Sequence, residues 1–424
     1  MKESLGEHIY RFMRYQRALA LWYTHPMRVL ATSDIHLGRK PTHRPSSLEG
    51  WAAVVACAKE QAVDVVVLAG DIIEHERAWM GIYGPLVEGL KELAQASIKV
   101  IAVAGNHDWQ IFPRLVKEEE NIVVLGSDGS WETYEHKGVR FVGRSFASSH
   151  DRKNPFERFD AKIFDKNLLT VGILHTDVAV SSSDYAPTIA NDYLHSGIDL
   201  WVLGHIHKPG FVSENKAFYC GSPFALDPAE RGAHGVYILE TEGTLGFKEP
   251  LFIPLSPVRY EQLQVPITAD QDTRAIQEVL TAQIRTFATE TDHEGDLYLD
   301  LLFTGSRNDA VVLDEVVGTT DQEGYFLEVG RTKVFVRKSD DATTLPLDLE
   351  SLATSGGIDG ILARLITEEK AIGEVYHQLD QESYNTQGFR ALTQEQLQPE
   401  QIQEHARRSA LRLLEAMVRQ REEG

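Results

Sequence analysis

Five apolar stretches of strand length run through residues 28–207, and each of them ends in a short polar motif. The stretches consist mainly of Val, Ile, Leu and Ala, which is typical of strands buried on both faces of a sheet. With their motifs they read RVLATSD (28–34), DVVVLAGD (64–71), KVIAVAGNHD (99–108), LLTVGILHTD (168–177) and IDLWVLGHIH (198–207). Between them, apolar residues recur at three- and four-residue spacing in 47–62 and 83–96, which predicts helices. The pattern predicts an α/β core whose sheet lies between other layers.

The pattern changes after residue 240, and the Pro-containing stretch 248–260 indicates the start of a second unit. Its pattern predicts a small α+β module with a helix at 269–288 and strands at 260–266, 296–303, 324–330 and 333–337. A polar stretch then leads to amphipathic helices at 358–379 and 399–421, which pack on their own domain or on a partner. We therefore expect four regions: an N-terminal extension (1–26), a main α/β domain (27–257), an α+β capping domain (258–345) and a C-terminal helical region (346–424).

Composition narrows the class of protein further. The 424 residues are 42 % hydrophobic and 25 % charged, which is ordinary for a globular protein of more than one domain. Only two cysteines, Cys57 and Cys220, are present, which indicates a reducing compartment and by default the cytoplasm. No apolar stretch is long enough to cross a bilayer, so we expect no membrane association. The net charge of −21 argues against a broad nucleic-acid-binding surface, although 31 of the 63 acidic residues lie in 261–424.

The polar motifs place potential metal ligands where the strands end, which is where open α/β sheets bind ligands. The candidates are Asp34, His36, Asp71, Asn106, His175, His205 and His207. In DxH and HxH, two side chains would lie on one side of an extended segment. Oxygen and imidazole donors without a thiolate suit Mn²⁺, Fe or Zn²⁺ rather than a structural zinc. Seven ligands are too many for one ion with open positions, so we expect two divalent ions that a carboxylate such as Asp71 can bridge.

Each motif alone is commonly an ordinary turn or loop, but their order and shared position at strand ends predict one site. The sequences TSDIHLG, LAGD, AGNHD, ILHT and LGHIHKP resemble the signature of the calcineurin-like metallophosphoesterase superfamily. The resemblance implies a four-layer fold of two β-sheets flanked by helices, with 27–257 as the catalytic domain. It implies that one metal is held by Asp34, His36, Asp71 and His207, and the other by Asp71, Asn106, His175 and His205. It also implies that His107 contacts the substrate phosphate and protonates the leaving oxygen, with Asp108 orienting its ring.

A longer resemblance narrows the family to bacterial DNA-repair exonucleases of the SbcD and YhaO type. It rests on ILHTDVAVSSSDYAP, GIDLWVLGHIHKP and FYCGSPFALDPAERGAHGVYILE, and on the order of domains. It implies a Mn²⁺-dependent DNA exo/endonuclease of double-strand-break repair that forms a homodimer and binds an SMC-like coiled-coil ATPase through its C-terminal helices. The basic residues of 38–44 and 152–158 are candidate DNA contacts or ordinary solvated surface. One departure is Glu74, which stands where such enzymes commonly carry His or Asp.

Three other functions are weighed against these motifs. A phosphodiesterase for nucleotides or other small phosphoesters would need every one of the metal ligands. A non-catalytic subunit of an ATPase assembly would usually have lost part of the ligand set, which is complete here. A protein phosphatase fits less well because the GDxVDRG continuation is absent.

Overall fold

The computed structural model describes residues 26–367 and 407–420, apart from positions 76, 78, 161–167, 181, 214–215, 244–245, 309, 318–325, 345, 408 and 419. The chain divides into two compact units, 1–259 and 260–424, which are treated separately below. Nearly all of the expected N-terminal extension, and the parts of the two C-terminal helices that fall within 368–406, lie outside the described residues.

The first sheet of the first unit holds three of the five predicted strands at its centre. Its order is β12-β11-β1-β2-β3-β4, with β1 to β4 parallel and both β11 and β12 antiparallel to their neighbours. All five residues of β2 are buried, as the near-continuous apolar run predicts. The strands are β1 (Arg28–Thr32), β2 (Val65–Ala69), β3 (Lys99–Val103), β4 (Ile122–Val124), β11 (Gly235–Glu240) and β12 (Leu251–Pro254).

The second sheet contains the other two predicted strands, β7 and β8. Its order is β5-β6-β7-β8-β10-β9, with β6, β7, β8 and β10 parallel and an antiparallel strand at each edge. The strands are β5 (Glu132–His136), β6 (Val139–Arg144), β7 (Leu169–His175), β8 (Leu200–Gly204), β9 (Gly210–Ser213) and β10 (Ala217–Tyr219).

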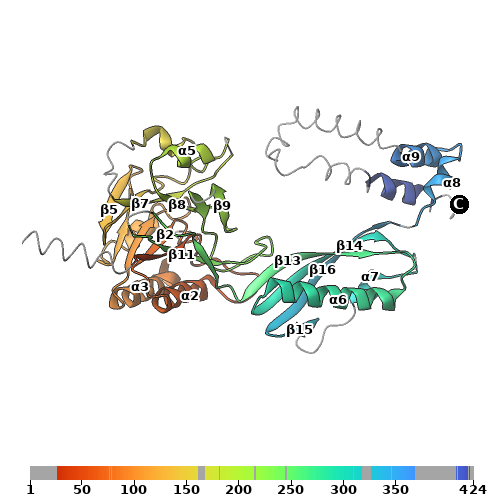
Figure 1. Ribbon diagram of the computed structural model, residues 1–424, viewed down its shortest axis with the longest axis horizontal. Helices are drawn as coiled ribbons and strands as arrows, with labels where there is room; N and C mark the ends of the chain where they lie inside the picture. Colours follow the sequence, from red (N-terminus) through yellow and green to blue (C-terminus); the bar gives the residue numbers. More distant parts are fainter. Residues whose placement is uncertain are drawn as a thin grey trace, which may run out of the picture. The chain divides into compact units, whose positions relative to one another are not determined.

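The two sheets pack face to face, and helices cover their outer faces (Figure 1). Because side chains alternate along a strand, Val67 and Ile101 enter the core between the sheets while their neighbours face the helices. Helices α2 (Ser47–Glu60) and α3 (Trp79–Gln95) cover the first sheet, and α5 (Ala190–His195) lies on the second. A capping box of Ser46 and Glu49 begins α2. This confirms the four-layer α/β fold that the motifs implied.

The second unit is a four-stranded sheet of order β13-β14-β16-β15 with one long helix packed on it. The strands are β13 (Val258–Ile267), β14 (Gly295–Ser306), β15 (Leu327–Val329) and β16 (Thr332–Thr344), and the helices are α6 (Thr273–Thr291) and α7 (Leu313–Val317). Ile276, Leu280 and Ile284 of α6 face the sheet. One expectation was wrong: the polar residues 339–344 do not start a connection but extend β16, where they pair with 301–306 of β14.

The chain continues into the short helices α8 (Leu349–Ala353) and α9 (Ile358–Thr367). Ala363 and Ile366 of α9 pack against Leu414, which belongs to the helical residues 409–418. Among the described residues, no helix is long and apolar enough to cross a membrane.

Phe141 lies at the centre of the core between the sheets and is fully buried. We expect Phe141→Ala to lower the free energy of unfolding of the first unit by about 3–5 kcal/mol, because it leaves a cavity between two rigid layers. Urea denaturation followed by tryptophan fluorescence measures this unit selectively, since all six tryptophans precede residue 260. Phe211→Ala, at a residue that is 45 % exposed, is the matched control, and an equal loss in both variants would contradict the assignment of the core.

Candidate metal centre

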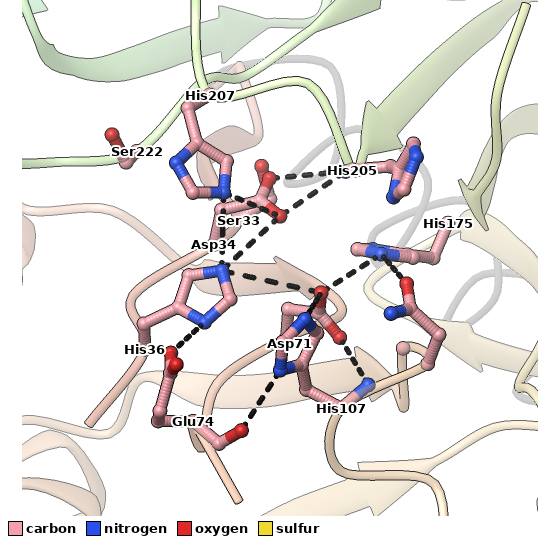
Figure 2. Close-up of polar contacts among 12 residues, drawn as sticks. Ser33, Asp34, His36, Asp71, Glu74, His107, His175, His205, His207 and Ser222 are labelled. Atoms are coloured by element: carbon pink, nitrogen blue, oxygen red, sulfur yellow. Dashed lines mark hydrogen bonds and ion pairs between the residues drawn. The ribbon is translucent and has the colours of Figure 1, made fainter. Parts of the chain in front are cut away.

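The candidate ligands come together where five strands from the two sheets end (Figure 2). The first sheet contributes Asp34 and His36 after β1, Asp71 after β2 and Asn106 after β3. The second sheet contributes His175 as the last residue of β7, with His205 and His207 following β8. The site therefore exists only when the two sheets are packed together.

The backbone that carries these residues is left-handed at four of them. The φ angles are 51° at Asp34, 50° at His36, 51° at Asp71 and 102° at His205. The expectation of extended DxH and HxH segments was therefore wrong, since β1 has already ended at Thr32 and the chain coils to turn its side chains inward. Such conformations cost about 1–3 kcal/mol each and persist where the surroundings impose them. Backbone hydrogen bonds between the loops do so here: Asp34 N–H and His36 N–H donate to the carbonyls of the segment after β2, both at 3.0 Å.

The first group of potential ligands is Asp34, His36 and His207. The Nε2 atoms of the two histidines lie 3.1 Å apart, and they are 4.0 and 3.9 Å from Asp34 Oδ1. On the outer side, Nδ1 of His36 lies 2.6 Å from Glu74 Oε2 and Nδ1 of His207 lies 2.7 Å from Glu230 Oε1. When each Nδ1 carries the proton that it donates to its carboxylate, both Nε2 lone pairs point at the same space. Two lone pairs facing each other beside a carboxylate fit a bound cation.

The second group is Asp71, His175 and His205, and Asn106 joins it. His175 Nε2 lies 3.2 Å from Asp71 Oδ2 and 3.0 Å from Asn106 Oδ1, while its Nδ1 donates to a carbonyl of β2 at 3.0 Å. Asp71 Oδ2 is also 4.0 Å from Nε2 of His36, so its carboxylate lies between the two groups. The two sets of four ligands that share Asp71 stay a prediction, and the position of this carboxylate allows it to serve both.

The charges of the second group favour a cation as well. Burial would raise the pKa of Asp71, but the imidazoles around it, His175 first, outweigh burial and hold that pKa below its usual range. Burial and the adjacent His175 lower the pKa of His205 to about 4, so this ring is neutral at pH 7. Burial lowers the pKa of His175, but Asp71 outweighs it and raises the pKa to about 9. A metal ion bound here would take the place of the proton on His175.

Two glycines allow these loops to approach one another. At Gly70, where φ is 93°, an added methyl group would lie 2.5 Å from Nδ1 of His175. At Gly105, it would overlap the carboxylate of Asp71. Larger side chains at these positions would push the strand ends apart.

His107 lies at the open side of the centre, with 41 % of its side chain exposed. Its backbone N–H donates to Asp71 Oδ1 at 2.9 Å, and its Nε2 lies 4.0 Å from Asp71 Oδ2. Its Nδ1 donates to the backbone carbonyl of Glu74 at 2.8 Å. The ring is thus held with Nε2 available beside the metal ligands, where a substrate would bind.

The expectation that Asp108 orients the ring of His107 was wrong. Asp108 is fully buried, and its carboxylate accepts three backbone hydrogen bonds, from Ile72 (2.7 Å), Ile73 (3.1 Å) and Gly105 (2.8 Å). It therefore ties the loop after β2 to the loop after β3. Burial and the nearby charge of Asp71 raise the pKa of Asp108. Its role in the structure is to fix the backbone of both loops.

Sequence reasoning missed the two glutamates that orient the histidines. Glu74 was noticed only as a departure from a pattern, whereas the structure pairs it with His36. Glu230 Oε1 lies 2.7 Å from Nδ1 of His207 and also forms an ion pair with Arg39 Nη1 at 3.0 Å. Despite burial, the hydrogen bond from His207 and the charges of His207 and Arg39 lower the pKa of Glu230 to about 2. The spacing between residues 207 and 230 carries no local signal for this contact, so only the fold could reveal it.

The layered fold and this cluster define a metallophosphoesterase domain. Residues 27–209 match the calcineurin-like phosphoesterase family, and the chain therefore carries a domain of that family, as its motifs predicted.

Three relatives each match about half of the chain, and two of them have names from DNA repair. It is 28 % identical over 249 residues to the DNA double-strand break repair protein Mre11 of Methanopyrus kandleri, covering 50 % of this chain and 54 % of that protein. It is 26 % identical over 235 residues to the uncharacterized metallophosphoesterase YhaO of Bacillus subtilis, covering 53 % and 56 %. A second Mre11, from Haloferax volcanii, is 28 % identical over 226 residues, covering 50 % and 49 %. The chain thus spans about half the length of the curated relatives it matches.

Two solved structures match part of the chain at low similarity. A dimetal phosphatase from Danio rerio is 15 % identical and has a TM-score of 0.34, covering 55 % of this chain and all of that one. A purple acid phosphatase from yellow lupin is 12 % identical with a TM-score of 0.36, covering 53 % of this chain and 50 % of that one.

The contact between Glu230 and His207 makes a prediction about metal binding. We expect Glu230→Ala to weaken Mn²⁺ binding about 10- to 100-fold, because the His207 ring loses the acceptor that orients it. Glu230→Gln should lose less, since its amide oxygen can still accept from Nδ1. Calorimetric titration of the metal-stripped protein measures the affinity. Glu92→Ala, at an exposed surface ion pair with Lys59, is the control, and equal affinity in all variants would refute the positioning role.

Proposed function

We propose that this chain is a metal-dependent DNA nuclease that hydrolyses phosphodiester bonds and acts in double-strand-break repair. The observation that carries the proposal is the pair of ligand groups with the Asp71 carboxylate between them, beside the available Nε2 of His107. The family of the domain supports the reaction class, and the names of two relatives support DNA as the substrate. The proposed activity includes both exonuclease and endonuclease cleavage.

The roles of the residues follow from the geometry of the cluster. Asp34, His36, Asp71 and His207 would hold one ion, and Asp71, Asn106, His175 and His205 the other; Mn²⁺ is the proposed metal, and Fe or Zn²⁺ also suits these donors. Bound there, two divalent ions would supply positive charge to the phosphoryl oxygens and a water activated as a nucleophile at neutral pH. His107 donates a proton from Nε2 to the leaving oxygen, while its Nδ1 stays bonded to the Glu74 carbonyl.

The charges around the centre favour a local contact with DNA. Arg39 pairs with Glu230 at 3.0 Å and Arg152 with Asp184 at 2.5 Å, so two of the basic candidates already have acidic partners. Lys40, in the basic segment 38–44, is exposed. With a net charge of −21, the chain as a whole repels a phosphate backbone. DNA binding by an assembly fits this balance better than binding by the chain alone.

The C-terminal helices supply the proposed docking surface for an SMC-like coiled-coil ATPase. Ile358, Ile361 and Leu365 of α9 are exposed and follow one another at three- and four-residue spacing. The opposite side of α9 packs on Leu414 through Ala363. An outward apolar stripe of this kind suits a helix or coiled coil as its partner. We further propose that the protein forms a homodimer and acts in the cytoplasm. Residues 258–345 are proposed to form its capping domain.

Activity on linear DNA, single-stranded DNA and bis-p-nitrophenyl phosphate, with Mn²⁺ or EDTA, tests the nuclease assignment. We expect Mn²⁺-dependent cleavage of DNA, and we expect His107→Ala to lower kcat about 10²- to 10⁴-fold because it removes the proton donor. The variant should keep its bound Mn²⁺, which distinguishes a proton donor from a ligand. His195→Ala, an exposed histidine at the end of α5, is the control.

Each alternative function has its own outcome in that experiment. Cleavage of the small ester alone would indicate a phosphodiesterase for small phosphoesters. If none of the three substrates is hydrolysed with Mn²⁺, the enzyme assignment is wrong and a structural subunit is favoured.

Mixing the protein with the coiled-coil ATPase of the same genome tests the partner. We expect Ile361→Asp to weaken that complex about tenfold or more, because the charge would be buried in an apolar contact. Size-exclusion chromatography and calorimetry measure the complex. Leu251→Asp, which changes an exposed leucine of β12, is the control, and equal binding by Ile361→Asp and the unaltered protein would exclude α9 from the interface.

A further inference from the structure

A hollow of about 550 Å³ opens beside the candidate metal centre. It is lined by Asn106 and His107 of the centre and, beyond them, by His75, Arg77, Trp109 and Ser149. Its size is within the range of pockets that hold small organic ligands. Whatever fills it would lie next to the atoms at which the phosphodiester is cleaved.

The lining of the hollow suits an anionic ligand. Among its described lining residues none is acidic, whereas Arg77 is cationic and two others are histidines. This contrasts with the net charge of −21 for the whole chain. A phosphate-bearing molecule would therefore be attracted to this part of the surface.

Trp109 is presented to the hollow from a fixed backbone. The residue before it is Asp108, whose carboxylate is anchored by three backbone hydrogen bonds. Just beyond it begins α4 (Ile111–Leu115), where Phe112 N–H donates to the carbonyl of Asp108 at 3.0 Å and the Phe112 ring is fully buried. The indole is itself only partly buried. Trp109 thus offers an aromatic surface on a backbone that is already held in place, which lowers the entropy lost on binding.

Aromatic rings continue from the hollow toward the second ligand group. Ser149, in the wall of the hollow, bonds through its hydroxyl to Nδ1 of His150 at 2.9 Å. The ring of His150 stacks on Tyr185, with centroids 5.9 Å apart and 21° between the planes. Tyr185 in turn lies 4.9 Å from the ring of His205. Planar groups therefore border the centre on the side of His205 as well as at Trp109.

We infer that Trp109 stacks on the base of a nucleotide next to the phosphate that is cleaved, and that the substrate is a phosphodiester that carries nucleobases. The inference rests on the proposed phosphodiesterase reaction and adds the group that the hollow recognises. Stacking on a tryptophan tolerates every base, because each base has a π-face, so this contact selects nucleic acid without selecting a sequence.

Comparing two proteins on two substrates separates this role from a structural one. The substrates are a labelled single-stranded oligothymidylate and an oligomer of the same length built from abasic tetrahydrofuran residues. The value of kcat/KM with Mn²⁺ is measured on each substrate, for the unaltered protein and for Trp109→Ala. The preference is the ratio of kcat/KM on the base-bearing strand to kcat/KM on the abasic strand. We expect this ratio to fall about 5- to 150-fold in the variant, which corresponds to a stacking free energy of about 1–3 kcal/mol per base. Trp109→Phe should retain most of the preference, since a phenyl ring also stacks.

The control is Trp79→Ala, because this exposed tryptophan begins α3 and is not among the residues that line the hollow. Equal loss on both substrates in Trp109→Ala would overturn the inference and leave Trp109 a structural residue, while the nuclease proposal stands. If the unaltered protein cleaves linear duplex DNA but neither single strand, the inference is overturned while the nuclease proposal stands. If it cleaves no DNA at all, the nuclease proposal itself fails. An equal loss of preference in Trp79→Ala would also overturn the assignment to Trp109.

Discussion

The carboxylate of Asp71 is the group on which the arrangement of the centre depends. It lies between the two ligand groups, 3.2 Å from His175 Nε2 and 4.0 Å from His36 Nε2, and it accepts the backbone N–H of His107. A buried anion of this kind needs positive charge around it, and the imidazoles of His175, His36 and His107 surround it. The left-handed turn at Asp71 and the absence of a side chain at Gly105 are both consequences of bringing this carboxylate to the centre.

Three carboxylates outside the ligand set hold the centre in shape. Glu74 and Glu230 each fix one histidine ring through Nδ1, and Asp108 fixes two loops through backbone N–H groups. These contacts link parts of the chain that are far apart in sequence, so a change in one loop is transmitted to the ligands. Glu230 further connects the centre to Arg39 in the loop that follows the first ligand pair, which joins metal binding to a surface proposed to meet DNA.

The metal centre forms only when the two sheets are packed together. Asp34 and Asp71 come from the first sheet and His175 and His205 from the second, and the apolar core between the sheets holds those strand ends in place. Folding energy from that core therefore supports strained backbone at the edge, including the φ of 102° at His205. The hollow beside His107 forms at the same edge, where loops rather than strands make the surface.

By itself, the sequence determined where the five buried strands lie along the chain and which residues end them, because apolar periodicity and short motifs are local signals. The order of the strands within the two sheets came from the structure. The class of the domain followed from the same motifs. Only the tertiary structure decided how the side chains converge: the left-handed turns at Asp34 and His36, the partner of His207 at residue 230 and the anchoring role of Asp108. These depend on contacts between distant segments, for which the chain carries no local pattern. The polar end of β16 belongs to the same class, since its pairing with β14 rather than its composition makes it a strand.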